Sequence, residues 1–270
     1  MTALLDIRGL TIRANDKPLV SDLSFTIRPG ERIGLIGESG SGKSMTAMAA
    51  TGLLPPSISV AGSIELDGQQ VVGATDRVMN RLRGVAAAVV FQEPLTALDP
   101  LMKISRQIAE PVRRRLEREG GKVTTEVINR EVRDLIDKVA LPQPERIAKS
   151  YPHEVSGGQR QRVAIAMALA CRPKLLIADE PTTALDVTTQ AEILALLDRL
   201  VRETGMALLF ISHDLPVVAQ VVERVIVLRN GLAVEEGAVG TVFGKPRHDY
   251  TKTLVEAARL FDEALGTTGS

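Results

Sequence analysis

A glycine-rich segment at residues 37–44 constrains the fold of this chain more than any other feature. It has the sequence Gly-Glu-Ser-Gly-Ser-Gly-Lys-Ser and matches the pattern G-x-x-x-x-G-K-[ST]. Residues 32–36 before it have the apolar composition of a buried strand, and residues 45–53 after it have the pattern of a helix. This order predicts a phosphate-binding loop. The alternative is a flexible turn that precedes a helix by chance.

The residue types in this loop suit a nucleotide. The glycines let the backbone curl so that successive N–H groups point inward, and the start of the helix adds partial positive charge. Lys43 would reach the β- and γ-phosphates, and the hydroxyl of Ser44 would bind Mg²⁺.

Composition narrows the class of protein. The 270 residues include 33 Lys and Arg and 33 Asp and Glu, so no overall charge attracts nucleic acid or an anionic membrane. The longest apolar runs, such as residues 85–91, are much shorter than the roughly 20 residues that span a bilayer. The first residues lack a positively charged start followed by an apolar stretch, so secretion is not expected. The single cysteine, Cys171, fits a reducing compartment and is expected to be a buried core residue.

The order of predicted elements indicates an α/β protein. Residues 4–12 and 20–27 alternate apolar and polar side chains as an antiparallel hairpin would, and residues 62–68 form another such strand. Residues 95–155 have helical spacing and are expected to form an insertion. After it, strands at 174–178 and 207–211 alternate with helices at 187–203 and 215–222. A hairpin at 224–235 and a helical end from residue 238 follow.

Two carboxylates follow the predicted strand at 174–178. In a nucleotide-hydrolysing sheet, Asp179 would lie beside the Mg²⁺ of the phosphate loop. Glu180 could orient and deprotonate an attacking water molecule. The alternative is a pair of acids that begins a turn before Pro181.

A second glycine-rich helix start lies at Ser156-Gly157-Gly158-Gln159, before a predicted helix at 160–171. A serine N-cap followed by two glycines leaves backbone N–H groups open to an anion. One γ-phosphate does not need two such anion-binding helix starts from the same chain. The second helix start therefore suggests contact with a nucleotide held by another subunit.

Together these motifs resemble, in kind and in order, those of the ATP-binding subunits of ABC transporters. The resemblance covers about residues 4–253 and extends to three further motifs. Gln92 matches the Q-loop, Ala184-Leu185-Asp186 matches the D-loop, and His213 matches the switch histidine. It implies a P-loop NTPase core of the RecA type with an antiparallel β-subdomain and an inserted α-helical subdomain. The expected domains are a nucleotide-binding domain at 1–240, containing the helical subdomain at about 95–155, and a helical extension at 241–270.

The family also implies a mechanism, in which two cassettes close head to tail around two ATP molecules. Ser156, Gly157, Gly158 and Gln159 would then contact the nucleotide of the neighbouring cassette. Glu180 would be the general base, His213 would hydrogen-bond the γ-phosphate and water, and Gln92 would sense both Mg²⁺ and water. Mg²⁺ would be held by Ser44, Gln92 and, through water, Asp179. The nucleotide-binding residues would be Gly37, Glu38, Ser39, Gly40, Ser41, Gly42, Lys43, Ser44 and Met45, with Asp186 in the D-loop.

One departure concerns adenine. The family usually places an aromatic residue upstream of the phosphate loop to stack on the base, but residues 11–15 read Thr-Ile-Arg-Ala-Asn. The sequence therefore predicts weaker adenine binding, or binding supported by Ile12 or by the guanidinium of Arg13.

A narrower resemblance points to the branch that imports oligopeptides, dipeptides or nickel chelates. It is carried by residues 91–100, 108–111, 151–154 and 247–251, with Asp249 where a proline is usual. Many relatives also carry a cysteine-rich C-terminal extension, whereas the sequence here has the single cysteine Cys171. The branch implies a second ATPase subunit, a paralogue or another copy, with two permeases and an extracytoplasmic solute-binding protein. The expected location is peripheral, at the cytoplasmic face of the cell membrane.

Three alternatives remain at this point. The cargo could be nickel or a metal chelate, although the distant His153 and His248 are poor evidence for a metal site. The chain could be a soluble ABC protein that acts on ribosomes or DNA, although such relatives usually carry two cassettes. It could also be a regulatory cassette that binds nucleotide without hydrolysing it.

Overall fold

The computed structural model describes residues 2–183 and 185–266. The chain folds as two units, one formed by Met1–Asn80 with Gly205–Ser270 and the other by Arg81–Thr204. Each unit has its own strands, helices and buried apolar residues.

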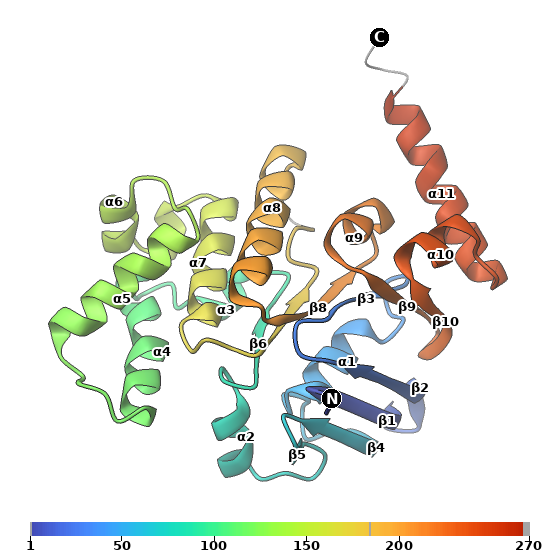
Figure 1. Ribbon diagram of the computed structural model, residues 1–270, viewed down its shortest axis with the longest axis horizontal. Coiled ribbons are helices and arrows are strands. Elements are labelled where there is room, and N and C mark those ends of the chain that lie inside the picture. The colour runs from blue at the N-terminus through green and yellow to red at the C-terminus, as the bar shows by residue number, and fades with distance from the viewer. Residues whose placement is uncertain (1, 184, 267–270) are drawn as a thin grey trace. The chain divides into compact units, whose positions relative to one another are not determined.

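An antiparallel sheet opens the first unit. Its strands are β1 (Leu5–Ala14), β2 (Lys17–Ile27), β4 (Ile58–Leu66) and the short β5 (Gln69–Gln70), in the order β2-β1-β4-β5 (Figure 1). Apolar side chains alternate with polar ones along β1 and β2, so one face of the hairpin is buried. The predicted hairpin and the strand after it are confirmed.

Parallel strands carry the phosphate loop. In the first unit, β3 (Arg32–Ile36) lies between β8 (Ala207–Ser212) and β9 (Arg224–Arg229) and is parallel to both. β10 (Leu232–Ala238) pairs with β9 in antiparallel orientation. Helix α1 (Lys43–Ala50) follows β3, and α9 (Leu215–Val221) follows β8. A side chain on Gly34 would meet Val218 of α9 at 2.7 Å, so glycine lets this helix pack directly on β3.

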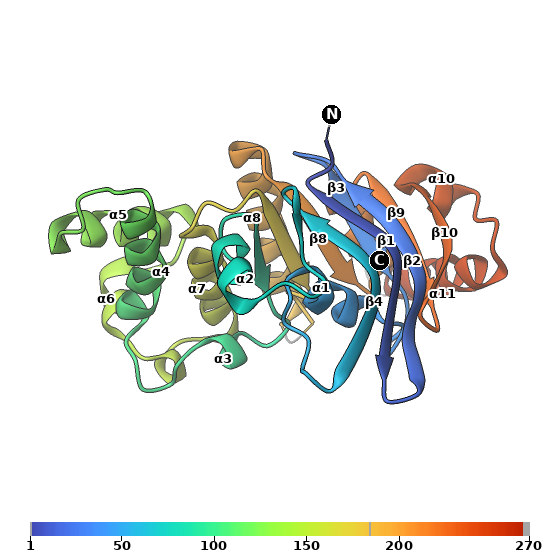
Figure 2. The same ribbon diagram turned by 90° about the horizontal axis from the view of Figure 1, so that it is seen from below.

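Two helices end the first unit. They are α10 (Val239–Gly244) and α11 (Asp249–Gly266), and α10 lies beside β10 (Figures 1 and 2). The predicted helical end of the chain is confirmed as far as the structure describes it.

The second unit is mainly helical. Its strands β6 (Ala87–Val90) and β7 (Leu175–Asp179) are parallel partners. Its helices are α3 (Pro94–Ala97), α4 (Ile104–Arg118), α5 (Thr125–Lys138), α6 (Pro144–Lys149), the 3-10 turn η1 (Pro152–Glu154), α7 (Gly157–Leu169) and α8 (Val187–Thr204). Helix α2 (Asp76–Leu82) spans the point where the chain passes between units.

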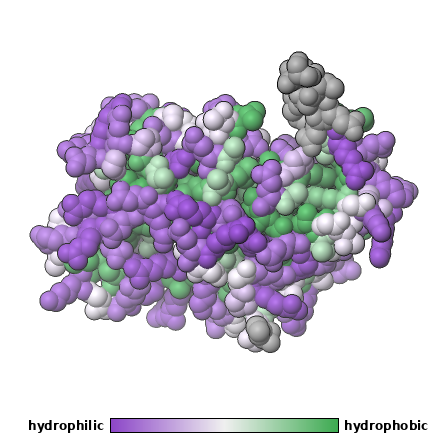
Figure 3. Space-filling view, turned by 45° about the horizontal axis from the view of Figure 1, so that its top comes forward, coloured by the Kyte–Doolittle hydropathy of each residue, from purple (hydrophilic) through white to green (hydrophobic). Residues whose placement is uncertain are grey.

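Amphipathic faces hold the helices of the second unit together. Figure 3 shows hydrophilic side chains over much of the region of α4 and α5, while their apolar residues, such as Ile108 and Val132, are buried. The buried Arg115 of α4 forms a 2.9 Å ion pair with Glu131 of α5. This pair adds a polar link to the apolar contact between the two helices.

Local patterns predicted most of these elements, with small shifts at their ends. α1 begins two residues before the predicted start, and α7 begins at Gly157 and not at residue 160. The sequence reading missed α2 and β5, and it did not separate α3 and η1 from the rest of the predicted helical insertion. The domain boundaries given above stay a prediction. Within the described residues, no helix combines the length and apolarity needed to cross a bilayer.

Cys171 lies just beyond α7 and is half-buried, so the prediction of a buried core residue was wrong in degree. Burial raises the pKa of its thiol, whose sulfur lies 3.4 Å from the carbonyl oxygen of Pro111. A raised pKa disfavours the thiolate, and with it a role as a nucleophile.

Candidate functional site

The loop at residues 37–44 wraps around the side chain of Lys43. This side chain is only 4% exposed, and its Nζ donates hydrogen bonds to the carbonyl oxygens of Gly37 at 2.8 Å and Glu38 at 3.0 Å. The ammonium is therefore held against the loop backbone. A fixed positive charge within a turn of backbone amides suits an anion.

Glycine is required in this loop for close approach of other backbone segments. A Cβ on Gly37 would lie 2.2 Å from the carbonyl oxygen of Leu228. On Gly42, whose φ is 102°, a Cβ would lie 2.8 Å from the carbonyl oxygen of Leu19. Gly40 also has positive φ, but a Cβ there would meet nothing within 4 Å. The outer side of the loop is thus closely packed, while the peptide at Gly40 is open.

The loop fits a polyphosphate on a further observation. The hydroxyl of Ser41 is buried and has no hydrogen-bond partner among the described residues. A buried hydroxyl of this kind calls for a polar partner. Lys43 next to it offers an ammonium for phosphate oxygens. The exposed Ser44, in the first turn of α1, offers a hydroxyl that can bind a hydrated Mg²⁺.

His213 lies at the same edge of the sheet as this loop. Ile36 of β3 pairs with Ser212 of β8 in parallel register, so Gly37 and His213 leave adjacent strands at the same level. The segment beyond His213 is fixed, because Asp214 caps α9 and its own N–H donates to the hydroxyl of Ser212 at 3.0 Å. The first unit therefore brings His213, the predicted switch histidine, to the same sheet edge as the phosphate loop.

The second unit brings Gln92, Asp179 and Glu180 together in the same manner. Val90 of β6 pairs with Ala178 of β7, so the predicted Q-loop follows one strand, while Asp179 ends the neighbouring strand and Glu180 follows it. Asp179 is buried, whereas Gln92 is exposed.

Glu180 has an unusual backbone conformation. Its φ is 47°, in the left-handed region that non-glycine residues seldom adopt. The hydroxyl of Thr183 donates a 3.0 Å hydrogen bond to its carboxylate. Strain of this kind is concentrated at functional sites, where surrounding contacts fix a side chain in one direction.

Residues 156–159, which we name the signature segment, form a complete helix cap at the start of α7. The hydroxyl of Ser156 accepts the backbone N–H of Gln159 at 3.3 Å, and the Gln159 side chain accepts the N–H of Ser156 at 3.0 Å. Gly157 and Gly158 form the first turn of α7, which corrects the predicted helix start. The segment is thus a rigid helix terminus, and the first two residues of the helix, both glycines, have no side chain to cover their N–H groups.

The signature segment packs on the D-loop. A Cβ on Gly157 would lie 3.3 Å from Cδ2 of Leu185, and one on Gly158 would lie 2.4 Å from Cγ2 of Thr189. Asp186 accepts hydrogen bonds from the backbone N–H of Thr189 at 3.0 Å and from its hydroxyl at 2.7 Å. Both bonds lower the pKa of Asp186, and the bond from the backbone N–H has the larger effect. Ala184 of the predicted D-loop lies outside the described residues.

The two residues considered for adenine differ in exposure. Ile12 is fully buried between β2 and β4, where it pairs with Val20 and Val60. The suggestion that Ile12 supports the base was therefore wrong, because its side chain belongs to the core. Arg13 is exposed.

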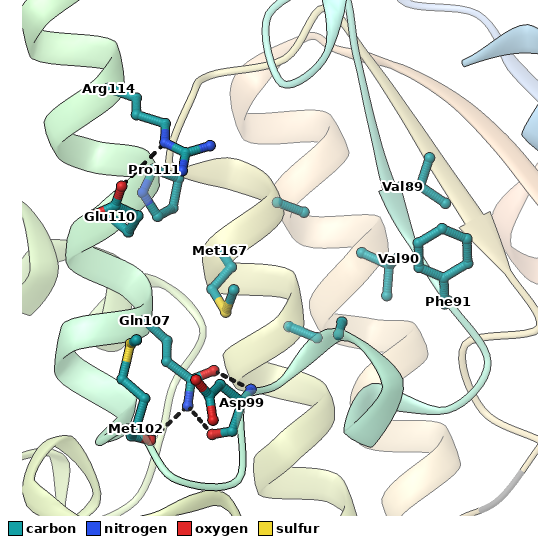
Figure 4. Close-up of a pocket in the computed structure, with 13 residues that line it drawn as sticks. Val89, Val90, Phe91, Asp99, Met102, Gln107, Glu110, Pro111, Arg114 and Met167 are labelled. Atoms are coloured by element: carbon teal, nitrogen blue, oxygen red, sulfur yellow. Dashed lines mark hydrogen bonds and ion pairs between the residues drawn. The ribbon is translucent and has the colours of Figure 1, made fainter. Parts of the chain in front are cut away.

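An open cavity of about 440 Å³ lies in the second unit beside the Q-loop. Figure 4 shows Glu110, Pro111 and Arg114 of α4 on one side, Val89, Val90 and Phe91 on the other, and Met167 of α7 between them.

Gln107 of α4 fixes the loop at one end of this cavity. It is 4% exposed and forms three hydrogen bonds, accepting the N–H of Asp99 at 2.9 Å and donating to the carbonyls of Asp99 at 2.9 Å and Met102 at 2.7 Å. The sequence reading missed Gln107. The available signal was a polar residue within the apolar stripe of α4.

No cluster of three or more His, Cys, Asp or Glu side chains able to hold a metal ion occurs in residues 2–183 and 185–266. Mg²⁺ commonly takes few protein ligands together with phosphate oxygens and water, so such a cluster is not required for it.

Comparisons with known proteins agree with this geometry. The family model described as ABC transporter matches residues 20–183. The oligopeptide transport ATP-binding protein OppD of Salmonella typhimurium is 45% identical over 263 residues, which are 96% of this chain and 77% of that protein. OppD of Escherichia coli is 43% identical over 264 residues, with the same coverage of 96% and 77%.

Solved structures resemble the fold. A dimeric, post-hydrolysis state of the ATP-binding cassette MJ0796 bound to ADP and Pi superposes with a TM-score of 0.75 at 28% identity. The superposition covers 87% of this chain and 98% of that one. The predicted fold class, a P-loop NTPase core with an antiparallel β-subdomain, is confirmed.

Proposed function

Since this chain belongs to the ABC transporter family, we propose that it is the ATP-hydrolysing subunit of an importer that takes up oligopeptides or related peptides through separate permeases. The observation that carries this proposal is the similarity, over nearly the whole chain, to proteins named for oligopeptide transport. The loop geometry around Lys43 supports ATP as the nucleotide that is consumed.

ATP binding is assigned to the phosphate loop, residues 37–45. The backbone N–H groups and the ammonium of Lys43 would bind the β- and γ-phosphates. Mg²⁺ would be held by Ser44, by Gln92 and, through water, by Asp179. When bound, it would neutralise phosphate charge. These assignments rest on motif positions, on the loop geometry and on the shared strand edges that carry the residues.

Hydrolysis is assigned to Glu180. Its carboxylate would take a proton from water as the water oxygen attacks the γ-phosphorus, while the bond to the β–γ bridging oxygen breaks and ADP leaves. His213 would hydrogen-bond the γ-phosphate and the attacking water, and Gln92 would respond to the presence of both. The constrained backbone of Glu180 supports this role, because a general base must be held in one direction.

The signature segment, Ser156 to Gln159, is assigned to the ATP of a neighbouring cassette. A capped helix start with two glycines offers open N–H groups to a γ-phosphate. The dimeric cassette with ADP and Pi is a structural precedent for pairing. The neighbour would be a paralogous ATPase subunit or a second copy of this chain. ATP that contacts both cassettes would favour the closed pair, and loss of the γ-phosphate would release it.

The cavity beside α4 is assigned as the docking site for a permease. Leu101 is 87% exposed and Leu95 is 50% exposed, and both lie in the segment between the Q-loop and α4. Exposed leucines next to an apolar hollow suit a short helix of a partner protein. The chain would thus dock peripherally at the cytoplasmic face of the membrane on two permeases fed by an extracytoplasmic binding protein. The helical subdomain at about 95–155 would carry this contact.

Reconstitution tests the proposal. The chain would be assembled with its permeases and second ATPase subunit in proteoliposomes that contain the binding protein and a labelled oligopeptide. We expect uptake that requires ATP and Mg²⁺ and is lost in a Glu180→Gln assembly. ATP hydrolysis without any peptide uptake would contradict the transport assignment while leaving the ATPase assignment intact.

A further inference from the structure

A residue from the C-terminal part of the chain contacts the phosphate loop. The backbone N–H of Glu38, the second residue of the loop, donates a 2.9 Å hydrogen bond to the hydroxyl of Tyr250. Tyr250 lies in the first turn of α11 and is 5% exposed. Both residues belong to the first unit, although more than two hundred residues separate them in the sequence.

Two neighbouring residues contact Tyr250, one at its ring and one at its backbone N–H. The guanidinium of Arg229, at the end of β9, lies 4.9 Å from the ring centroid, within the range of a cation–π contact. The N–H of Tyr250 donates to Nδ1 of His248 at 3.2 Å. Burial raises the pKa of the Tyr250 phenol, so its hydroxyl stays neutral near pH 7.

The backbone before Tyr250 is anchored on β10. The carboxylate of Glu235 accepts the N–H groups of Arg247 at 2.9 Å and His248 at 3.0 Å, one on each oxygen. Burial opposes ionisation of Glu235, but its hydrogen bonds, led by the one from the backbone N–H of Arg247, prevail and lower its pKa. We name residues 247–250 the C-terminal anchor. Its place is set by the sheet that carries the loop, and not by α11 alone.

The hydrogen bond from Glu38 complements the one formed by Lys43. The carbonyl oxygen of Glu38 accepts from the Lys43 ammonium, while its N–H is bound by Tyr250. When the ammonium turns to phosphate oxygens, its bonds to the loop carbonyls weaken. The carbonyl of Gly37, which also accepts from Lys43, and the N–H of Glu38 belong to one trans peptide and point in opposite directions, so the bond to Tyr250 can persist through that exchange.

A second contact from the same part of the chain supports the loop. The N–H of Gly231, in the turn between β9 and β10, donates to the carbonyl oxygen of Ser41 at 3.1 Å. The β9–β10 hairpin and the C-terminal anchor therefore hold the loop at two points, Ser41 and Glu38.

We propose that Tyr250 is a positioning residue for ATP binding, whose hydroxyl holds the phosphate loop in the shape that receives the phosphates. A loop ordered before binding loses less conformational entropy when the ligand arrives, so its affinity is higher. The hydroxyl does not touch the reacting atoms in this scheme. Its removal should therefore weaken ATP binding and leave the rate at saturation unchanged. The inference rests on the proposed function for the identity of the ligand.

The test compares Tyr250→Phe with the wild-type full chain. Phenylalanine keeps the ring beside Arg229 and removes the acceptor for the Glu38 N–H. We expect the Kd for Mg-ATP to rise about three- to tenfold, as loss of one hydrogen bond predicts. In the assembled transporter we expect KM for ATP to rise by a similar factor, with kcat within about twofold of wild type and a single cooperative thermal unfolding transition that shows the variant is folded.

Two further variants complete the design. Thr253→Val is the matched control, because it removes an exposed hydroxyl that bonds only within α11 and should leave the Kd unchanged. Glu235→Gln weakens the anchor without touching Tyr250 or the loop, and should raise the Kd in the same direction by a smaller factor.

The outcomes are distinct. Equal ATP affinity in Tyr250→Phe and wild type would overturn the positioning role while the proposed function stands. A fall in kcat without a rise in KM would also overturn it, because the hydroxyl would then act in hydrolysis. A wild-type chain that fails to bind ATP would overturn the proposed function, and this inference with it.

Discussion

Thr189 leaves no room for a side chain on Gly158: a Cβ there would lie 2.4 Å from its Cγ2 atom. The hydroxyl of the same threonine donates a 2.7 Å hydrogen bond to Asp186. One side chain thus joins the first turn of the signature helix to the D-loop. If the signature faces the ATP of a neighbouring cassette, the D-loop must move with it when the pair closes.

The first prediction concerns this contact. Gly158→Ala should lower ATP hydrolysis by the paired cassettes by about ten- to a hundredfold, because an overpacked turn costs about 1–3 kcal/mol or displaces the helix start. ATP binding to a single chain should not change, since that binding is assigned to the phosphate loop. The measurements are steady-state ATPase activity of the pair and equilibrium binding to the isolated chain.

Thr189→Ser offers a matched rescue. Serine removes the methyl group that faces Gly158 and keeps the hydroxyl that bonds Asp186. The double variant Gly158→Ala with Thr189→Ser should recover part of the lost activity, while Thr189→Ser alone should be close to wild type. Losses that simply add would contradict a direct steric coupling between the two residues.

The second prediction concerns the general base. Glu180→Gln should lower kcat for ATP at least about a hundredfold, because an amide cannot take the proton from water. The Kd for ATP should change little, and a stable ATP-bound pair should accumulate, measurable by sedimentation with and without ATP. Glu203→Gln, an exposed change at the end of α8, is the control. Undiminished hydrolysis would remove Glu180 from its role.

The third prediction concerns the loop beside the cavity. Gln107→Leu keeps the volume of the side chain but leaves backbone groups of Asp99 and Met102 without their partner, a loss of about 1–3 kcal/mol for that loop. Because the loop carries the exposed Leu101, we expect peptide uptake and permease-stimulated hydrolysis to fall. The Kd for ATP should stay the same.

Gln69→Leu provides the control for this prediction, since Gln69 is exposed on the short strand β5. It should leave uptake unaffected. Normal uptake by the Gln107→Leu assembly would show that the loop is not part of the permease contact.

The fourth prediction concerns adenine. Residue 14 ends β1 and is half-exposed, so a larger side chain can be placed there. Ala14→Tyr should increase ATP affinity by about 1–3 kcal/mol, the range of aromatic stacking on a base. Arg13→Ala should weaken it if the guanidinium now supports the ring. Equilibrium binding of ATP and of a purine-free triphosphate separates a base contact from a general effect on the loop.

The sequence predicts elements that depend on local pattern. The loop of Lys43, the capped signature helix, the two carboxylates after β7 and the β9–β10 hairpin all follow from residue types at fixed spacing. The shared strand edges of His213 with the loop, and of Gln92 with Glu180, agree with the alternation of strands and helices. Most helix and strand boundaries were therefore right within a few residues.

Contacts between residues that are distant in the chain could not be predicted from the sequence. Nothing in the neighbourhood of Tyr250 indicates that its hydroxyl bonds Glu38, and nothing near Thr189 indicates that its methyl group faces Gly158. The left-handed backbone of Glu180 is also set by surroundings and not by the residue itself. Ile12 was misassigned because burial depends on both flanking strands.

The central claim is that the two glycine-rich helix starts of one chain hold two different ATP molecules. A structure of the Glu180→Gln assembly with Mg-ATP tests it most directly, through the distance from the Ser156 hydroxyl to the nearest γ-phosphate. We predict hydrogen-bond contact with the ATP seated on the phosphate loop of the neighbouring cassette. A Ser156 remote from every γ-phosphate, or next to the ATP bound by its own Lys43, would contradict the account.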